Sequence, residues 1–264
     1  MKIFIKTLFC TSLLCIALTA QGAVSTIVST ADTFVTTGPT NNLAGNNYGG
    51  AGTLMVASSS AAQGEMQSLL QFNLASTVSA FNTAYGVGGW AISSIKLSLG
   101  TNFAMAGAQP NNPIFNLVEP GSFGVDWMSN DSWIEGSGSP SSQNGIGVNF
   151  NTLSNYLSIN DSSLGTFNWT APGPSNTNVV SLWTLDQNAS LDNDIDAGGL
   201  VSFRLYAADN SVGYLFNSRS FASAPGNFPQ LIITAVAAPE PNTACLLGLT
   251  TLLACGIQRL RRRQ

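Results

Sequence analysis

Short runs in which apolar and polar residues alternate constrain the fold of this chain most strongly. In residues 68–74, SLLQFNL, apolar side chains alternate with Gln71 and Asn73, which is the period of a β-strand with one buried face. Residues 94–99 (SIKLSL) and 201–207 (VSFRLYA) repeat the pattern. Loops rich in Gly, Pro, Asn and Ser separate such runs, so the sequence predicts strands rather than helices.

Further strand candidates set the size of the predicted fold. They are residues 53–57, 113–118, 165–169, 213–217 and 231–236. The body has no repeat at a fixed period and no linker long enough to divide it. We therefore expect an all-β fold in one domain, residues 24–237, built as a single antiparallel β-sandwich of jelly-roll-like type.

The first 23 residues have the pattern of a secretory signal peptide. Lys2 and Lys6 precede an apolar run from about Leu8 to Ala20, and small residues follow it. This predicts an N-terminal signal helix that is cleaved near Gly22 or Ala23, and therefore an exported protein.

The charge of the body excludes one class of partner. Residues 23–238 hold three basic residues against twelve acidic ones, a net charge of −9. Nucleic-acid binding needs clustered Lys and Arg, so no nucleic-acid partner is expected, and an anionic lipid surface is disfavoured for the same reason. All four cysteines lie in the two terminal segments, so the body folds without disulfides.

Residues 181–199 contain the clearest helix signal. Ser190 is a candidate cap for a turn that contains Leu191 and Ile195, and Gly198 is a candidate end.

The same stretch raises a metal alternative. Asp192, Asp194 and Asp196 alternate as in the first half of a calcium loop. The glycine of such a loop is replaced by Ala197, however, and no closing glutamate follows. We expect an acidic helical turn and no cofactor, with Ca²⁺ as the alternative.

The chain has no histidine, which limits its catalytic chemistry. Nucleophile systems that depend on a histidine base are excluded. The carboxylates of Glu119, Asp126, Asp131 and Glu135 are the candidates for a polysaccharide hydrolase, but they lie in a loop-forming region without a catalytic motif. We therefore expect a protein that is not an enzyme, with a carboxylate-dependent hydrolase as the alternative.

Trp127 and Trp133 stand six residues apart in DWMSNDSWIEG. On one strand this even spacing would place both indoles on one face, where an exposed pair could stack against sugar rings. The competing interpretation is that the two side chains plug an end of the core, because Trp buries most of its area.

A series of segments over residues 30–236 resembles the extracellular β-sandwich modules called DNRLRE domains, which are related to disaggregatase-type carbohydrate-binding modules. The series begins with ADTFVTTGPTNNLAGNNYGGAGTLMVASSS and continues through SLLQFNLAST, ISSIKLSL, DWMSNDSWIEGSGSP, GTFNWTAPG, GGLVSFRLYA, YLFNSRSF and PQLIITAV. The resemblance implies a jelly roll that associates with polysaccharide and has no catalytic residues. The chain lacks the basic sequence for which the domain is named.

The last 27 residues, 238–264, resemble the PEP-CTERM sorting signal. An apolar run over residues 243–257 separates the Pro-Glu-Pro motif from the arginines of this signal, which together are Pro239, Glu240, Pro241, Arg259, Arg261, Arg262 and Arg263. Fifteen helical residues span about 22 Å, less than a membrane core of about 30 Å, so the run suits a transient transmembrane helix. The arginines favour the cytoplasmic side.

The sorting resemblance implies a partner and a location. An exosortase would cleave near the motif and release the protein from a transient inner-membrane anchor to the cell surface or extracellular matrix of a Gram-negative bacterium. We expect an exported, exopolysaccharide-associated protein.

Overall fold

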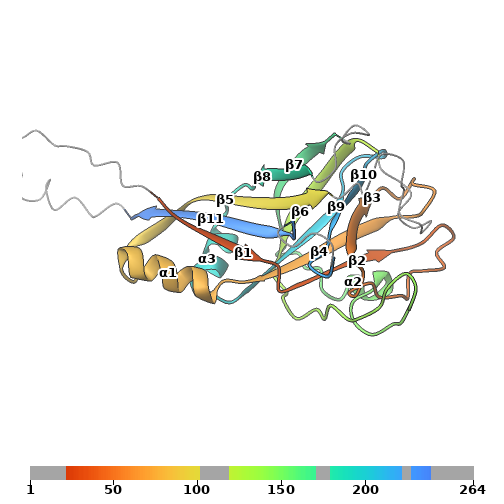
Figure 1. Ribbon diagram of the computed structural model, residues 1–264, viewed down its shortest axis with the longest axis horizontal. Coiled ribbons are helices and arrows are strands. Elements are labelled where there is room, and N and C mark those ends of the chain that lie inside the picture. The colour runs from red at the N-terminus through yellow and green to blue at the C-terminus, as the bar shows by residue number, and fades with distance from the viewer. Residues whose placement is uncertain (1–21, 102–118, 171–178, 222–226, 239–264) are drawn as a thin grey trace, which may run out of the picture.

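The structure is a computed structural model that describes residues 22–101, 119–170, 179–221 and 227–238. The strands of these residues form two antiparallel β-sheets (Figure 1). The small sheet has the spatial order β1 (Ala23–Val28), β11 (Gln230–Ala237), β5 (Trp90–Thr101) and β8 (Val179–Thr184). The large sheet has the order β10 (Gly213–Asn217), β3 (Thr53–Ala57), β4 (Met66–Asn73), β9 (Leu200–Ala207), β6 (Gly121–Met128) and β7 (Ser162–Trp169), and β2 (Ala31–Thr36) also pairs with β4. The predicted all-β class is confirmed.

The strand order is simplest to describe when β2, β3 and β10 are left out. We number the remaining described strands first to eighth along the chain. The small sheet then has the order first (β1), eighth (β11), third (β5), sixth (β8). The large sheet has the order second (β4), seventh (β9), fourth (β6), fifth (β7). β1 and β11, which are far apart in sequence, are therefore neighbours, with Ala23 opposite Ala235.

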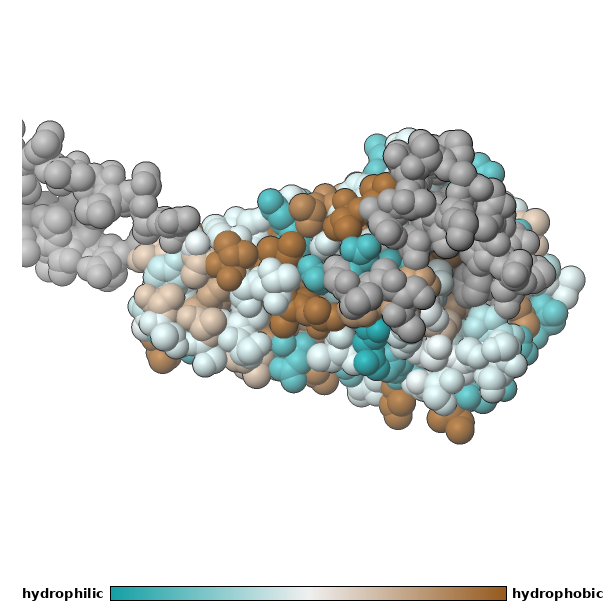
Figure 2. Space-filling model, in the orientation of Figure 1, coloured by the Kyte–Doolittle hydropathy of each residue, from teal (hydrophilic) through white to brown (hydrophobic). Residues whose placement is uncertain are grey.

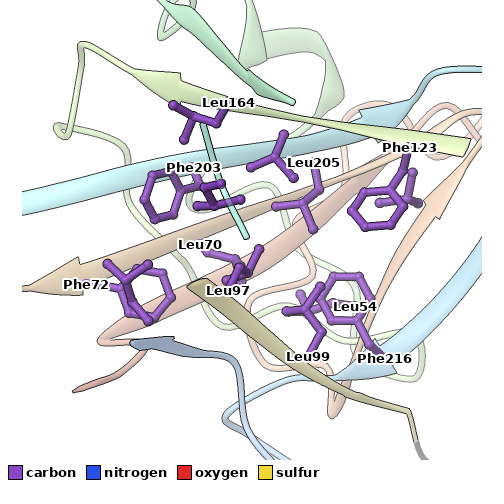
Figure 3. Packing of buried hydrophobic residues seen from close by; sticks show 14 of the residues in the cluster. Leu54, Leu70, Phe72, Leu97, Leu99, Phe123, Leu164, Phe203, Leu205 and Phe216 are labelled. Atoms are coloured by element: carbon purple, nitrogen blue, oxygen red, sulfur yellow. The ribbon is translucent and has the colours of Figure 1, made fainter. Parts of the chain in front are cut away.

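Buried side chains from the two sheets meet between the layers. Leu97 and Leu99 of β5 belong to the same core cluster as Leu54 and Leu70 of the large sheet (Figure 3). Full burial of each such side chain contributes about 1.5–3 kcal/mol. This shared core holds the sheets face to face.

A second buried cluster lies on the outer face of the large sheet. Its members are apolar side chains of β2, β4 and β6 and of the segment that follows β6, including α2 (Phe150–Leu153). They are Val35, Leu69, Met128, Trp133, Val148 and Leu153. Because this outer cluster covers part of its outer face, β4 is buried on both faces along most of its length.

The strand predictions that fall on described residues agree with the structure. The strand predicted at residues 113–118 lies outside the described residues. Sequence analysis missed α1 (Ala75–Tyr85), whose Ser and Thr residues carry no charge pattern. The helical turn predicted within residues 181–199, between Ser190 and Gly198, is present as α3 (Ala189–Ala197), and residues 179–184 form β8.

The terminal predictions cover residues 1–23 and 238–264, of which 1–21 and 239–264 lie outside the described residues. None of the helices in the described ranges is long and apolar enough to cross a membrane.

Candidate functional site

Trp127 and Trp133 are buried, with 8% and 4% of their surface exposed. Trp127 lies in the core between the sheets, and its Nε1 donates to Asp194 Oδ2 at 3.0 Å. Trp133 lies in the outer cluster, and its Nε1 donates to Ser202 Oγ at 2.9 Å. The two indoles do not form an exposed pair on one face, because β6 ends at Met128 and strand alternation does not continue to residue 133. Their burial favours the core-plug interpretation.

The four candidate catalytic carboxylates have separate surroundings. Glu135 pairs with Arg219, while Asp126 lies beside Arg204 and Asp161. Glu119 is exposed, and its backbone pairs with that of Gly213. Burial, followed by the charge of Asp194, raises the pKa of Asp131 to about 6. Each of these carboxylates therefore has its own set of neighbours.

The three aspartates of the calcium alternative all lie on α3. Residues two apart in an α-helix are rotated by about 200°, so Asp194 points away from the side that Asp192 and Asp196 share. Within the described residues, no group of three His, Cys, Asp or Glu side chains is placed to hold a metal ion. The helix therefore does not present the three carboxylates as one calcium loop.

A buried carboxylate that sequence analysis did not single out ties three segments together. Asp32 of β2 accepts hydrogen bonds from Ser218 Oγ at 2.7 Å and from Ser29 Oγ and the Arg219 N–H, both at 2.9 Å. The Asp32 N–H donates to Glu135 Oε1 at 3.0 Å, and Glu135 also pairs with the Arg219 guanidinium. Burial raises the pKa of Asp32 despite these donors. This network joins β2 to Glu135 and to residues 218–219, so its role is structural.

A half-exposed polar cluster lies on the outer face of the large sheet, beside the outer cluster. Arg204 of β9 stands opposite Asp126 of β6, with Arg204 Nη1 at 3.9 Å from Asp126 Oδ2. Arg204 Nε donates to Gln67 Oε1 of β4 at 2.7 Å. The phenol of Tyr206 donates to Asp126 Oδ1 at 3.2 Å, and its ring centre is 4.8 Å from Arg204 Cζ. We call these residues, Gln67, Asp126, Arg204 and Tyr206, the polar face.

Gly124 gives the Tyr206 ring its place on this face. The two residues are directly opposite in the β6–β9 pairing, and a Cβ at Gly124 would lie 2.5 Å from Tyr206 Cζ. Any larger side chain there would push the ring away from the sheet.

β7 extends the polar face with small polar side chains. Ser163 stands opposite Asp126, Thr166 opposite Gly124, and Asn168 opposite Ser122. Directly opposite residues in an antiparallel pair share one face, and these three β7 residues are exposed. The face thus offers hydroxyl, amide, carboxylate and guanidinium groups around one aromatic ring, which suits the hydroxyls and flat faces of a sugar.

The sequence did not predict that Arg204 and Asp126 lie opposite each other. The usable signal was the alternation in VSFRLYA, where Arg204 and Tyr206 share the polar side of the strand. The sorting residues Pro239 to Arg263 lie outside the described residues.

No family model matches this chain, and no curated protein matches it. The functional assignment therefore depends on the fold and the polar face.

Proposed function

We propose that this is an exported, non-enzymatic surface or matrix protein that binds polysaccharide through the polar face. The observation that carries the proposal is the cluster of Asp126, Arg204 and Tyr206, where one half-exposed aromatic ring is fixed among charged hydrogen-bonding groups on a rigid sheet. Rigid placement of such groups lowers the entropy lost on binding.

The strand order supports this proposal. An order of first, eighth, third, sixth facing second, seventh, fourth, fifth is that of a jelly roll, so we take β2, β3 and β10 as additions to one. The DNRLRE resemblance implies the same fold and the same class of ligand.

The two chain ends support sorting through a membrane. Because β1 and β11 are paired, the described chain begins and ends at the same end of the sandwich (Figure 1). A signal peptide before β1 and a PEP-CTERM helix after β11 would enter the membrane side by side. In this proposal an exosortase removes the second, and the body moves to the cell surface or matrix.

The charge of the body favours neutral polysaccharides as ligands. Twelve acidic residues against three basic ones give residues 23–238 a net charge of −9, which repels acidic chains at low salt. Arg204 lies on the polar face, but Asp126 is beside it, and burial followed by the charge of nearby Asp161 raises the pKa of Asp126.

A binding experiment with a matched pair of variants tests the proposal. The exported protein is applied to a glycan array, followed by titration with the best neutral polysaccharide. We expect Arg204→Gln and Tyr206→Ala each to weaken binding at least tenfold. Lys96→Gln, the same loss of a positive charge on the outer face of the small sheet, should leave the affinity unchanged. Equal affinity in all variants would remove the polar face as the binding site.

The hydrolase alternative is tested in the same samples. Release of reducing ends from a bound polysaccharide, abolished by Asp126→Asn or Glu135→Gln, would replace the non-enzymatic proposal with the hydrolase.

A further inference from the structure

The outer edge of β1 has backbone groups without a partner strand in the described part of the chain, where β1 pairs with β11 alone. The Ser29 N–H donates to Pro229 O at 3.0 Å, in register with the β1–β11 ladder. Hydrogen-bonded pairs alternate in an antiparallel ladder, so Ser25 and Ile27 bond to β11, while at the start of the strand the Ala23 N–H donates to Tyr85 Oη instead. The N–H and C=O groups of residues 24, 26 and 28 therefore point away from β11.

Three of the features that commonly prevent strand addition are missing from this edge. Protein edges are commonly protected by charges, proline or bulges. β1, AVSTIV, has no charge and no proline, and its register with β11 is unbroken. Val24 and Val28 are 63% and 41% exposed.

Helix α1 holds the inward-facing residues of β1 and leaves the outward-facing ones exposed. Ser25 Oγ lies 2.8 Å from Thr77 Oγ1, and the Ala23 N–H donates to Tyr85 Oη at 2.7 Å. Figure 2 shows apolar residues over the part of the surface where β1 and β11 lie in Figure 1. The strand is thus fixed in an extended form before any partner arrives.

We propose that β1 of a second copy of this chain pairs antiparallel with this edge, centred on Thr26. In this register Thr26 faces Thr26 of the second copy, and Val24 faces Val28. Each outward N–H then meets a carbonyl of the other copy, because the three outward-pointing residues are symmetric about Thr26. Thr–Thr and β-branched cross-strand pairs each stabilise a ladder.

The charge distribution allows this contact. Lys96 is the one charged residue among the strands of the small sheet in the described chain, so the acidic residues lie outside these strands. Two small sheets can therefore join edge to edge without burying a carboxylate. The net −9 of each body still acts at long range, so salt should strengthen the dimer.

Single cysteines test the register directly. In a hydrogen-bonded antiparallel pair the Cα atoms lie about 5.5 Å apart, within the roughly 4.4–6.8 Å that a disulfide spans. We expect the exported Thr26→Cys protein to form a disulfide-linked dimer on mild oxidation. The two copies of residue 24 would be about 13 Å apart along the strands, so Val24→Cys should not cross-link. Wild type, whose cysteines lie only in the terminal segments, gives the background.

Sedimentation velocity over a range of concentrations tests the dimer itself. We expect a concentration-dependent twofold mass for wild type and at least a tenfold higher dissociation constant for Thr26→Lys. Val180→Lys, at an exposed position on β8 at the other edge, should leave the dissociation constant unchanged. A wild type that stays monomeric at its highest soluble concentration, or equal cross-linking of the two cysteine variants, would overturn the proposal. Neither assay contains a glycan, so its result is independent of polysaccharide binding.

Discussion

Two aspartates show how the environment of a single residue decides its effect on stability. Burial raises the pKa of Asp131 to about 6 from its ordinary value of 3.8. Asp209 behaves oppositely: although burial opposes it, hydrogen bonds from the N–H groups of Ser211, Val212 and Ser122 lower its pKa to about 2. The folded state thus disfavours one carboxylate and favours the other.

We predict that Asp131→Asn and Asp209→Asn change stability in opposite directions at pH 7. The pKa of Asp131 is higher in the folded state than in the unfolded state. This carboxyl therefore contributes stability that is fully present below pH 3.8 and is lost as the pH rises through about 6. Asparagine has no charge to desolvate, so Asp131→Asn should add about 1 kcal/mol at pH 7, discounted because the carboxyl is only half-buried. The gain should disappear below pH 3.8.

Asp209→Asn is the matched control in this comparison. The pKa of Asp209 is lower in the folded state than in the unfolded state. This carboxylate therefore contributes stability that is present above pH 3.8 and is lost as the pH falls through about 2. This variant should therefore be less stable than wild type at pH 7 and equal to it near pH 2. Urea unfolding across the pH range measures both, and parallel pH profiles for the two variants would contradict the assigned environments.

Among the elements, α3 shows what sequence patterns find and what they misplace. The helix and its end at Gly198, which has a left-handed φ of 69°, were predicted. The N-cap was not: Asn188 Oδ1 accepts from the Leu191 N–H at 2.9 Å, two residues before the predicted cap Ser190. Both residues are good caps, and only the end of β8 at Thr184 decides between them.

We predict that Asn188→Ala costs about 1 kcal/mol of stability, because the Leu191 N–H loses its acceptor. Ser190→Ala should cost little, since Ser190 is exposed within the helix. Chemical denaturation of the two variants measures the difference. A larger loss for Ser190→Ala would show that the helix begins later than described here.

Two strands of the small sheet, β1 and β8, were not predicted from the sequence. β1 and β8 expose Val24, Val28, Val180 and Leu182 on the outer face of the small sheet, so they show no apolar–polar alternation. β4 and β9 were found because Gln71 and Arg204 interrupt their apolar residues. The polar face was missed for a different reason: Asp126 and Arg204 meet only through a strand pairing that joins residues far apart in sequence.

For the whole molecule, we predict one cooperative thermal transition that is insensitive to reductant and to calcium. The two sheets share a core cluster, and the cysteines lie outside the described residues. Because α3 turns Asp194 away from Asp192 and Asp196, added Ca²⁺ should not raise the melting temperature. Scanning calorimetry with and without each additive measures this. A rise of several degrees with Ca²⁺ that Asp192→Ala abolishes would restore the metal alternative.

The pairing of β1 with β11 would set the order of folding during the proposed export. β1 is the first described strand to be synthesised and β11 is the last, with nearly the whole body between Ala23 and Ala235. Closing a contact over so long a separation is slow, and it requires that the last strand has been made. In the proposed export, the small sheet therefore cannot be completed until translation has ended, which would keep its strands open for passage through a narrow translocation channel.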